Sequence, residues 1–523
     1  MTLDRSSLTA GFLKRELQAG VSVEKLLILV AALVSLLIDQ SFGGMYGAFQ
    51  NDVAGALGAS ADEQPWFSIG YNTFYYVTIL LSPWLIGRFG RRQVFGVGHF
   101  GFAVLTLYLA TSSSMAGFFI GRCFQGLAQG TFFVSSVLTV LTLFPPKLRG
   151  TVFSVFAVTS LSGAASGAFV GGWFRDNADW RDAFVTYAVF AIFAFSIIWT
   201  LLEAPPGKKT MPFDLIGVVF AFAAFFFFQY ASSFGERRDW LAAPDIVLSI
   251  FLTAIGFAGF IWRELYEDRC GFIQLSLFNI RNLSVASVLG FGLGVPLLGA
   301  NNFLQYAQAS LGFPPALAGA LLAMRIPAIL IVAPTVVLLV NADKIDVKVP
   351  VALGFIFVPM SYAMLAIQTT SESSFGTFAF ALVLSGIGFA CLFSPIANVM
   401  IRSLPDDVKS EGIAIFKLVL LLGGSVATTG LGAVYDRSFA GLDSLLAGEA
   451  SLRHFIQVGL SHPSSQVLAL VAQQATVLAY SQNSMVVAIS SLVNLPLVVL
   501  LRKPGAVALG KPSLQSPSPV KRP

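Results

Sequence analysis

The chain has 523 residues, of which 56% are hydrophobic and only 11% are charged, with a mean hydropathy of +0.77. A soluble domain carries about 25% charged residues because its surface must stay hydrated. The composition therefore excludes a soluble protein and indicates a membrane protein. The net charge of +5 does not indicate a nucleic-acid partner, because the basic residues lie in short clusters between apolar segments and form no continuous stripe.

Apolar segments long enough to cross a bilayer recur along almost the whole chain. A helix needs about 20 apolar residues to span the hydrocarbon core, and its backbone polar groups must be satisfied within the segment. The predicted spans, in chain order, are 25–47, 65–86, 93–112, 115–143, 150–173, 183–202, 213–233, 244–264, 283–308, 316–340, 349–368, 375–400, 411–434 and 483–501. The sequence thus predicts an all-α integral membrane protein with about fourteen transmembrane helices.

The distribution of basic residues predicts the orientation of these spans. If the N-terminus is inside, the cytoplasmic segments hold 23 of the 32 Lys and Arg residues, and the opposite face holds six. Cytoplasmic loops carry an excess of Lys and Arg. We therefore expect a multi-pass protein of the inner (cytoplasmic) membrane with both termini in the cytoplasm.

The gap between the second and third spans reads "IGRFGRRQVFG", residues 86–96. It resembles the loop signature G-x-x-x-D-R-x-G-R-R of the major facilitator superfamily through Arg88, Gly90, Arg91 and Arg92, which the resemblance makes candidates for a gating loop. The first Gly and the Asp of that signature are absent here. We therefore expect the arginines to meet carbonyl groups at helix C-termini, where cations are favoured.

Three further stretches resemble signatures of the same superfamily. "GRCFQGLAQG" matches the span-four signature through Arg122 and Gln125, and "LIDQS" places Asp39 on the acidic position typical of the fourteen-helix drug/proton antiporter branch. "SGAASGAFVGG" resembles the span-five antiporter signature through four glycines, which are Gly163, Gly167, Gly171 and Gly172. Glycines at a four-residue spacing let a neighbouring helix approach closely, so we expect a helix-packing face there.

The resemblance implies a major facilitator fold, in which two six-helix halves alternate access to a cavity at the bilayer midplane. We expect a cytoplasmic N-terminal segment at 1–22, the N-terminal half at 23–205, a two-helix insert at 206–270, the C-terminal half at 271–503 with a long outer loop at 436–482, and a disordered cytoplasmic tail at 504–523. In the outer loop, "SSQVLALVAQQATVLAY" predicts a surface helix. Whether this loop binds a periplasmic adaptor protein is left open.

Four ionisable residues fall inside the predicted spans: Asp39, Arg122, Arg325 and Lys417. Such residues are costly in a bilayer unless they are paired or hydrated, so they are functional candidates. Asp39 is the candidate proton carrier, with a fixed ion pair as the alternative, and we expect Arg122 to lie beside it and tune it. Arg325 and Lys417 are candidates for substrate binding, and the alternative for Lys417 is snorkelling to the membrane edge. One acid against three bases predicts a neutral or anionic amphiphilic substrate.

Two polar helix faces are further candidates for substrate binding. Gln125 and Gln129 follow Arg122 at i+3 and i+7, and a second face in span nine contains Asn301, Gln305 and Gln308. Amides cannot face lipid without losing hydrogen bonds, so both faces must contact the bundle interior or water. They line the central cavity in one interpretation and pack helices together in the other.

Tyr46, near Asp39 in span one, and Tyr75 in span two are candidates for stacking a planar ligand, with helix packing as the alternative.

The resemblance implies a proton-coupled exporter of a small amphiphilic compound, with protons and the lipid bilayer as its other partners. Uptake by proton symport and a non-transporting membrane sensor or assembly subunit are the alternatives. The sequence contains no phosphate-binding loop of the G-x-x-x-x-G-K-[ST] type and no spacing that predicts a metal site. We therefore expect no enzyme activity, no metal and no cofactor.

Overall fold

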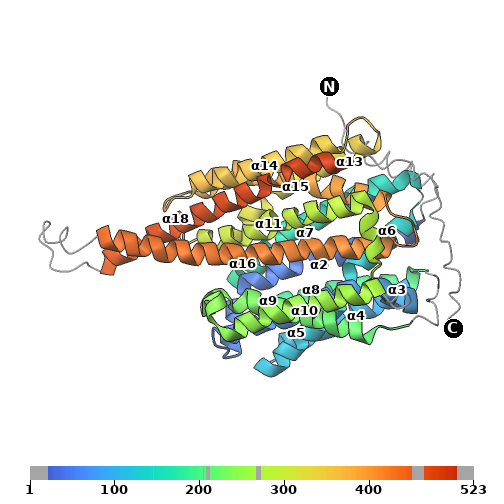
Figure 1. Cartoon of the computed structure of the whole chain (residues 1–523), viewed down its shortest axis with the longest axis horizontal. Helices are drawn as coiled ribbons and strands as arrows, with labels where there is room; N and C mark the ends of the chain where they lie inside the picture. Colours follow the sequence, from blue (N-terminus) through green and yellow to red (C-terminus); the bar gives the residue numbers. More distant parts are fainter. Residues whose placement is uncertain are drawn as a thin grey trace, which may run out of the picture.

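Long helices that run side by side make up almost all of the protein (Figure 1). The computed structural model describes residues 22–144, 146–203, 205, 207, 212–266, 272–449 and 465–502. Residues 1–21 of the expected N-terminal segment at 1–22 and the whole expected tail at 504–523 lie outside the described residues.

The elements divide along the chain into three groups. The first contains α2 (Val23–Ala56), α3 (Gln64–Phe89), α4 (Arg91–Thr111), α5 (Met115–Gln129), α6 (Phe132–Leu143), α7 (Pro146–Asn177) and α8 (Trp180–Leu201). The second contains α9 (Leu215–Phe234) and α10 (Pro244–Tyr266), joined by the short helices η1 (Glu236–Arg238) and η2 (Trp240–Ala242). The third contains η3 (Leu275–Asn279), α11 (Arg281–Ala309), α12 (Pro315–Ala323), α13 (Ile326–Asn341), α14 (Lys348–Gln368), α15 (Phe375–Arg402), α16 (Lys409–Glu449), α18 (Ser465–Leu492) and η4 (Leu495–Leu500).

Thirteen helical segments in the described part of the chain are long and apolar enough to cross a membrane, counting α5 with α6 and α12 with α13 as one segment each. The second predicted span corresponds to α3, which has 26 residues but carries Ser, Thr, Asn and Tyr side chains that make it less apolar. With α3 included, the fold agrees with the prediction of an all-α membrane protein with about fourteen spans.

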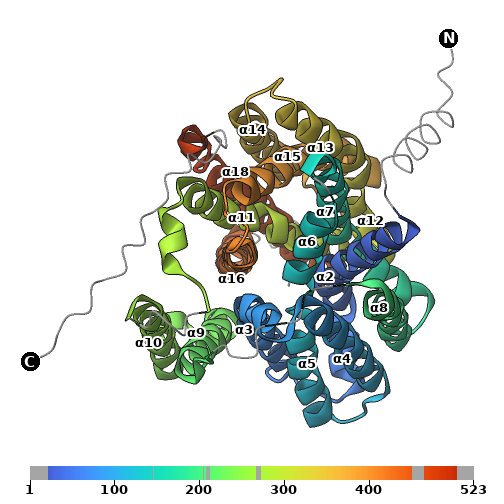
Figure 2. The same cartoon turned by 90° about the vertical axis from the view of Figure 1, so that its right-hand side faces the viewer.

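The end-on view separates the groups (Figure 2). In the following, the N-terminal half means α2–α8 and the C-terminal half means α11–α18. Helix α7 packs on α12 and α13, and α16 packs on α3 and α6, so these contacts join the two halves. The pair α9 and α10 packs on α3 at the edge of the bundle, as Figure 2 shows.

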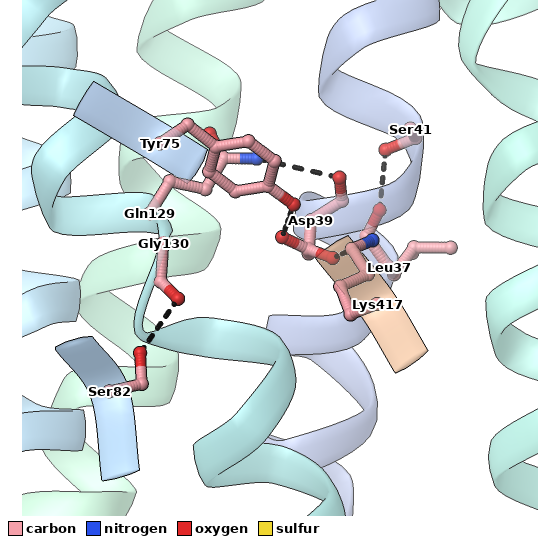
Figure 3. A network of polar contacts seen from close by, with 8 residues as sticks. All are labelled: Leu37, Asp39, Ser41, Tyr75, Ser82, Gln129, Gly130 and Lys417. Carbon is pink, nitrogen blue, oxygen red and sulfur yellow. Dashed lines mark hydrogen bonds and ion pairs between the residues drawn. The ribbon is translucent and has the colours of Figure 1, made fainter. Parts of the chain in front are cut away.

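Local sequence explains where several helices begin and break. Asp179 caps α8, because its carboxylate accepts a hydrogen bond from the Arg181 amide while Asp182 accepts one from the Asp179 amide. Predicted span four is broken between α5 and α6, where the Ser82 hydroxyl donates to the Gly130 carbonyl at 3.1 Å (Figure 3). Span ten is broken at Arg325, two residues before Pro327, a residue that cannot donate a helical hydrogen bond.

The expected outer loop at 436–482 needs a correction. Helix α16 continues to Glu449, and α18 already begins at Ser465, so only residues 450–464 between them lie outside the described part. The stretch predicted as a surface helix is therefore the first half of α18. Its glutamines find partners on neighbouring segments, because Gln473 donates to the Ser310 carbonyl at 3.2 Å and Gln474 to the Ser371 hydroxyl at 3.3 Å.

Candidate functional site

Asp39 lies in the middle of α2 and forms a buried ion pair with Lys417 of α16 (Figure 3). The Asp39 Oδ2 atom is 2.9 Å from Lys417 Nζ, and the Tyr75 hydroxyl donates to Asp39 Oδ1 at 2.7 Å. The two charged side chains are 0% and 4% exposed. The Asp39 carboxylate and the Lys417 ammonium group therefore connect the N-terminal half to the C-terminal half.

Lys417 reaches into the bundle and not toward the membrane edge, so the snorkelling alternative is wrong. Its Nζ atom lies 4.7 Å from the centre of the Phe133 ring. It also lines a narrow pocket with a cavity volume of about 10 Å³, which is room for about one water molecule. The residues that line this pocket come from both halves: Gln40, Phe133, Ser160, Leu161, Ala164, Leu297, Phe393, Phe416, Lys417 and Leu420. The pocket between the halves is thus mainly apolar and aromatic, with Lys417 of the ion pair in its wall.

Arg122 does not pair with Asp39, which corrects the expected arrangement. Its guanidinium carbon lies between the rings of Tyr46 and Tyr71, at 4.2 and 4.1 Å from their centres. Its Nη1 atom donates to Gln125 Oε1 at 2.6 Å. These contacts hold the guanidinium among two rings and an amide, and the carboxylate pairs with Lys417 instead.

Two tyrosine rings connect Arg122 to Asp39 indirectly. The ring of Tyr71, which contacts Arg122, stacks on the ring of Tyr75 with centres 5.6 Å apart and planes 14° apart. Tyr75 then donates to the Asp39 carboxylate. A change at Arg122 can therefore reach Asp39 by moving this stacked pair.

The predicted face of span four contacts the same region. Gln125 donates to the Thr106 hydroxyl of α4 at 2.7 Å, so it packs α5 against α4 within one half. Gln129 lies one turn further along α5 and donates to the Asp39 carbonyl oxygen at 3.4 Å. This places the end of α5 against the α2 turn that carries the carboxylate.

The predicted face of span nine is not part of this site. Gln305 is exposed and accepts a hydrogen bond from the Tyr480 hydroxyl of α18 at 3.5 Å, and Gln308 is half-buried. The side chain of Asn301 lies outside the described residues. The Gln305–Tyr480 contact therefore connects α11 to α18. The interpretation that this face lines the cavity stays a prediction.

Arg325 is buried within the C-terminal half and takes no part in the Asp39–Lys417 ion pair. It donates to the Tyr362 hydroxyl of α14 at 3.4 Å, and its guanidinium carbon is 5.0 Å from the centre of the Phe389 ring of α15. The sequence analysis singled out Arg325 but neither of these neighbours, because a single Tyr and a single Phe in apolar helices give no signal.

Two of the three loop arginines contact carbonyl groups toward helix C-termini, as expected from the sequence. Arg91 donates to the Leu138 carbonyl in the last turns of α6 at 3.1 Å, and Arg92 donates to the Trp199 carbonyl near the end of α8. Arg88 lies with its guanidinium carbon 5.9 Å from the Phe89 ring. Gly90 separates α3 from α4 with a φ of +88°, a conformation that side chains rarely adopt.

The glycines of α7 form two packing faces. A Cβ atom at Gly167 or Gly171 would lie 2.3 Å from the carbonyl oxygen of Ser41 or Met45 in α2, and one at Gly163 would contact Gln40. Gly172 points to the other half, where a Cβ would lie 2.4 Å from Pro315 at the start of α12. The α2 helix that carries Asp39 is thus packed directly on α7.

Tyr76 is a second contact between the halves that the sequence did not identify as such. Its hydroxyl lies 2.7 Å from the Ser425 hydroxyl of α16, two turns beyond Lys417. The three tyrosines in α3 at positions 71, 75 and 76 were visible in the sequence, but their partner on α16 was not.

Comparisons with known proteins agree with this architecture. Residues 29–428 match the family model described as Major Facilitator Superfamily. The chain is 24% identical over 387 residues to the "Multidrug export protein EmrB" of Haemophilus influenzae, covering 72% of this chain and 74% of that protein. It is 22% identical over 470 residues to the "Fatty acid resistance protein FarB" of Neisseria gonorrhoeae, covering 86% and 91%.

A solved structure of a POT family transporter in complex with 5-aminolevulinic acid superimposes with a TM-score of 0.59 at 14% identity, covering 90% of this chain and 96% of that one. This likeness concerns the fold alone. Taken with the family match over residues 29–428, it shows that the chain belongs to the Major Facilitator Superfamily of membrane transporters.

Proposed function

We propose that this protein is a proton-coupled exporter of small amphiphilic compounds that are neutral or anionic, with Asp39 as the proton carrier. The observation that carries the proposal is the buried Asp39–Lys417 ion pair between the two halves. The names of the relatives that export multiple drugs or confer fatty acid resistance support an efflux role.

Protonation of Asp39 changes the balance between the halves. An unpaired charge in a buried site is strongly unfavourable, whereas a paired one is tolerated. When Asp39 takes up a proton, Lys417 loses its counter-charge, and the buried position between α2 and α16 no longer suits it. The protonated protein therefore favours a conformation in which Lys417 is hydrated, and this requires the halves to separate around it.

The lining of the pocket beside the pair has the chemistry for an amphiphilic substrate, and the pocket itself must widen when the halves move, because it has room for about one water molecule. Phe133, Phe393 and Phe416 supply aromatic walls, while Gln40 and Lys417 supply polar groups at the same space. Four further candidates do not line this pocket but contact Arg122 or Asp39. Arg122 is contacted by Tyr46 and Gln125, and Asp39 by Tyr75 and Gln129. In this proposal these four residues position the proton site and affect substrate binding through it.

Transport by the purified full chain in proteoliposomes tests the proposal. Vesicles containing a pH-sensitive dye are given an imposed proton gradient, and the flux of neutral and anionic fluorescent amphiphiles is measured in both directions. The matched pair of variants is Asp39→Asn and Asp52→Asn, because both carboxylates lie on α2 but Asp52 pairs with Arg175 at the exposed end of the helix. We expect gradient-driven flux to be lost in Asp39→Asn and retained in Asp52→Asn.

The direction of flux separates the alternatives. Exchange of substrate against protons supports export, and movement of substrate together with protons would identify an uptake symporter instead. Absence of gradient-dependent flux for every compound, with no difference between the two variants, would identify a protein that transports nothing.

A further inference from the structure

Arg325 is a buried cation for which the described residues offer no carboxylate partner. The residue is 4% exposed. Its Nη2 atom donates to Tyr362, and its Nε atom is buried without a hydrogen-bond partner in the part of the chain that the structure describes. A guanidinium carries five N–H donors, and leaving buried donors unpaired is unfavourable. The side chain is therefore suited to an acceptor group that the protein itself does not supply.

Neighbouring helices hold this guanidinium in a fixed position. A Cβ atom at Gly386 of α15 would lie 2.5 Å from the Arg325 carbonyl oxygen, so α15 packs directly on the break between α12 and α13. The Tyr362 hydroxyl donates its proton to the Pro296 carbonyl of α11 at 2.5 Å. Its oxygen is therefore left as an acceptor for Arg325, and the arginine is oriented before any ligand arrives.

Arg325 lies behind the wall of the pocket between the halves. Leu297 and Phe393 line that pocket. Leu297 follows Pro296, which accepts the Tyr362 hydroxyl, and Phe393 lies one helical turn from Phe389, whose ring Arg325 contacts. The pocket has room for about one water molecule. A ligand body can therefore enter it only when the halves separate, and Leu297 and Phe393 must also move for its polar end to reach the guanidinium.

The other two interior cations are less suited to an anionic ligand. An anion on Lys417 would displace the Asp39 carboxylate and leave it buried and unpaired. Protons and the anion would then bind together, which is the opposite of exchange. The Nε atom of Arg122 is also buried without a partner in the described part of the chain. However, the rings of Tyr46 and Tyr71 already contact its guanidinium group, and neither ring lines the pocket.

We propose that Arg325, oriented by Tyr362, binds the carboxylate of an anionic amphiphilic substrate whose apolar body occupies the pocket between the halves. This inference rests on the proposed export function and adds a division of labour to it. Lys417 serves the proton site, and Arg325 recognises the negative charge of the substrate. Because Arg325 has no carboxylate to release, substrate can bind while Asp39 remains ionised, as exchange requires.

A pair of probes that differ only in charge tests the assignment. 1-Naphthaleneacetate and 1-naphthaleneacetamide share one aromatic body, and their export rates are compared in proteoliposomes at a pH where the acid is ionised. Wild type is expected to prefer the acid. Arg325→Gln should lower the acid-to-amide ratio by about 10- to 100-fold, the range for loss of a hydrogen bond to a charged group. Lys344→Gln, which removes an exposed charge between α13 and α14, should leave the ratio unchanged.

Arg325→Lys carries the test if Arg325→Gln does not reach the membrane. Lysine keeps the charge but loses the forked geometry that matches a carboxylate, so the ratio should fall between that of wild type and one. A wild-type ratio in either variant overturns the proposal.

Binding to the purified protein separates this result from a failure of the proposed function. If wild type exports neither probe, the increase in apparent unfolding temperature caused by each probe replaces the rate. The site is supported if the acid raises the unfolding temperature of wild type more than the amide does and this difference disappears in Arg325→Gln. Equal increases with the two probes in wild type contradict it.

Discussion

The interior of the protein stabilises positive charge in two different ways. Lys417 is neutralised across the boundary between the halves by Asp39. Arg122 and Arg325 are each held inside one half by aromatic rings and neutral hydrogen-bond partners. A pair across the boundary must break or rearrange when the halves move, whereas a charge held within one half moves with it. In the proposed mechanism, the first arrangement serves conformational coupling and the second serves recognition or packing.

The largest effect is expected where the pair across the boundary is broken. Lys417→Gln leaves the Asp39 carboxylate buried without its cation, and removing one partner of a buried pair costs about 3–5 kcal/mol. We expect a large fall in the free energy of unfolding, measured as a lower unfolding temperature in lipid nanodiscs. Asp39→Asn combined with Lys417→Gln should recover much of that loss, because it removes both charges. If the double variant is no more stable than the single one, the pair does not account for the effect.

A smaller effect is expected where an arginine is held by rings. Arg122→Gln loses the cation–π contacts with Tyr46 and Tyr71, and a desolvated contact of this kind contributes about 2 kcal/mol. The substitution also removes the cost of burying the charge, so the net loss should be smaller than for Lys417→Gln. Arg122→Lys keeps the charge, so its loss should be smaller. Proton-driven flux should fall in Arg122→Gln, because the substitution displaces the Tyr71–Tyr75 stack beside Asp39. Combining the variant with Tyr75→Phe tests whether the effect passes through this stack. Additive losses in flux would show that Arg122 does not act through this stack.

The smallest effect is expected at the second contact between the halves. Tyr76→Phe removes the hydroxyl that lies 2.7 Å from Ser425, and one such hydrogen bond contributes about 1 kcal/mol. We expect a small fall in unfolding temperature with proton coupling retained, measured as substrate flux per imposed pH gradient. Complete loss of coupling in Tyr76→Phe would mean that this contact, and not the ion pair, connects proton uptake to movement of the halves.

The fold could be predicted from the sequence because membrane-spanning segments are recognised by their length and apolar composition. Relations within one helix were also predictable: Arg122 and Gln125, three residues apart, form a hydrogen bond. Relations between helices were not, because hydropathy says nothing of how each helix is rotated about its axis. Asp39 and Lys417 are 378 residues apart in the chain, and Arg122 was the nearer but incorrect choice of partner.

The end of the chain shows a related limit. The glutamines near the start of α18 made that stretch look like a surface helix, because polar residues in a span are unfavourable unless they are paired. Gln473 and Gln474 are paired with groups of neighbouring segments, which no single-helix pattern could reveal.

The most direct test of the account is whether protonation of Asp39 alone changes the arrangement of the halves. Spin labels at Ala61→Cys and Glu372→Cys, in a background without Cys123, Cys270 and Cys391, place one probe on each half, and pulsed electron resonance measures the distance between them. We predict that acidification shifts the distance distribution in wild type, and that Asp39→Asn shows the acid-type distribution at both acidic and alkaline pH. An Asp39→Asn protein that still responds to pH as wild type does would contradict the account.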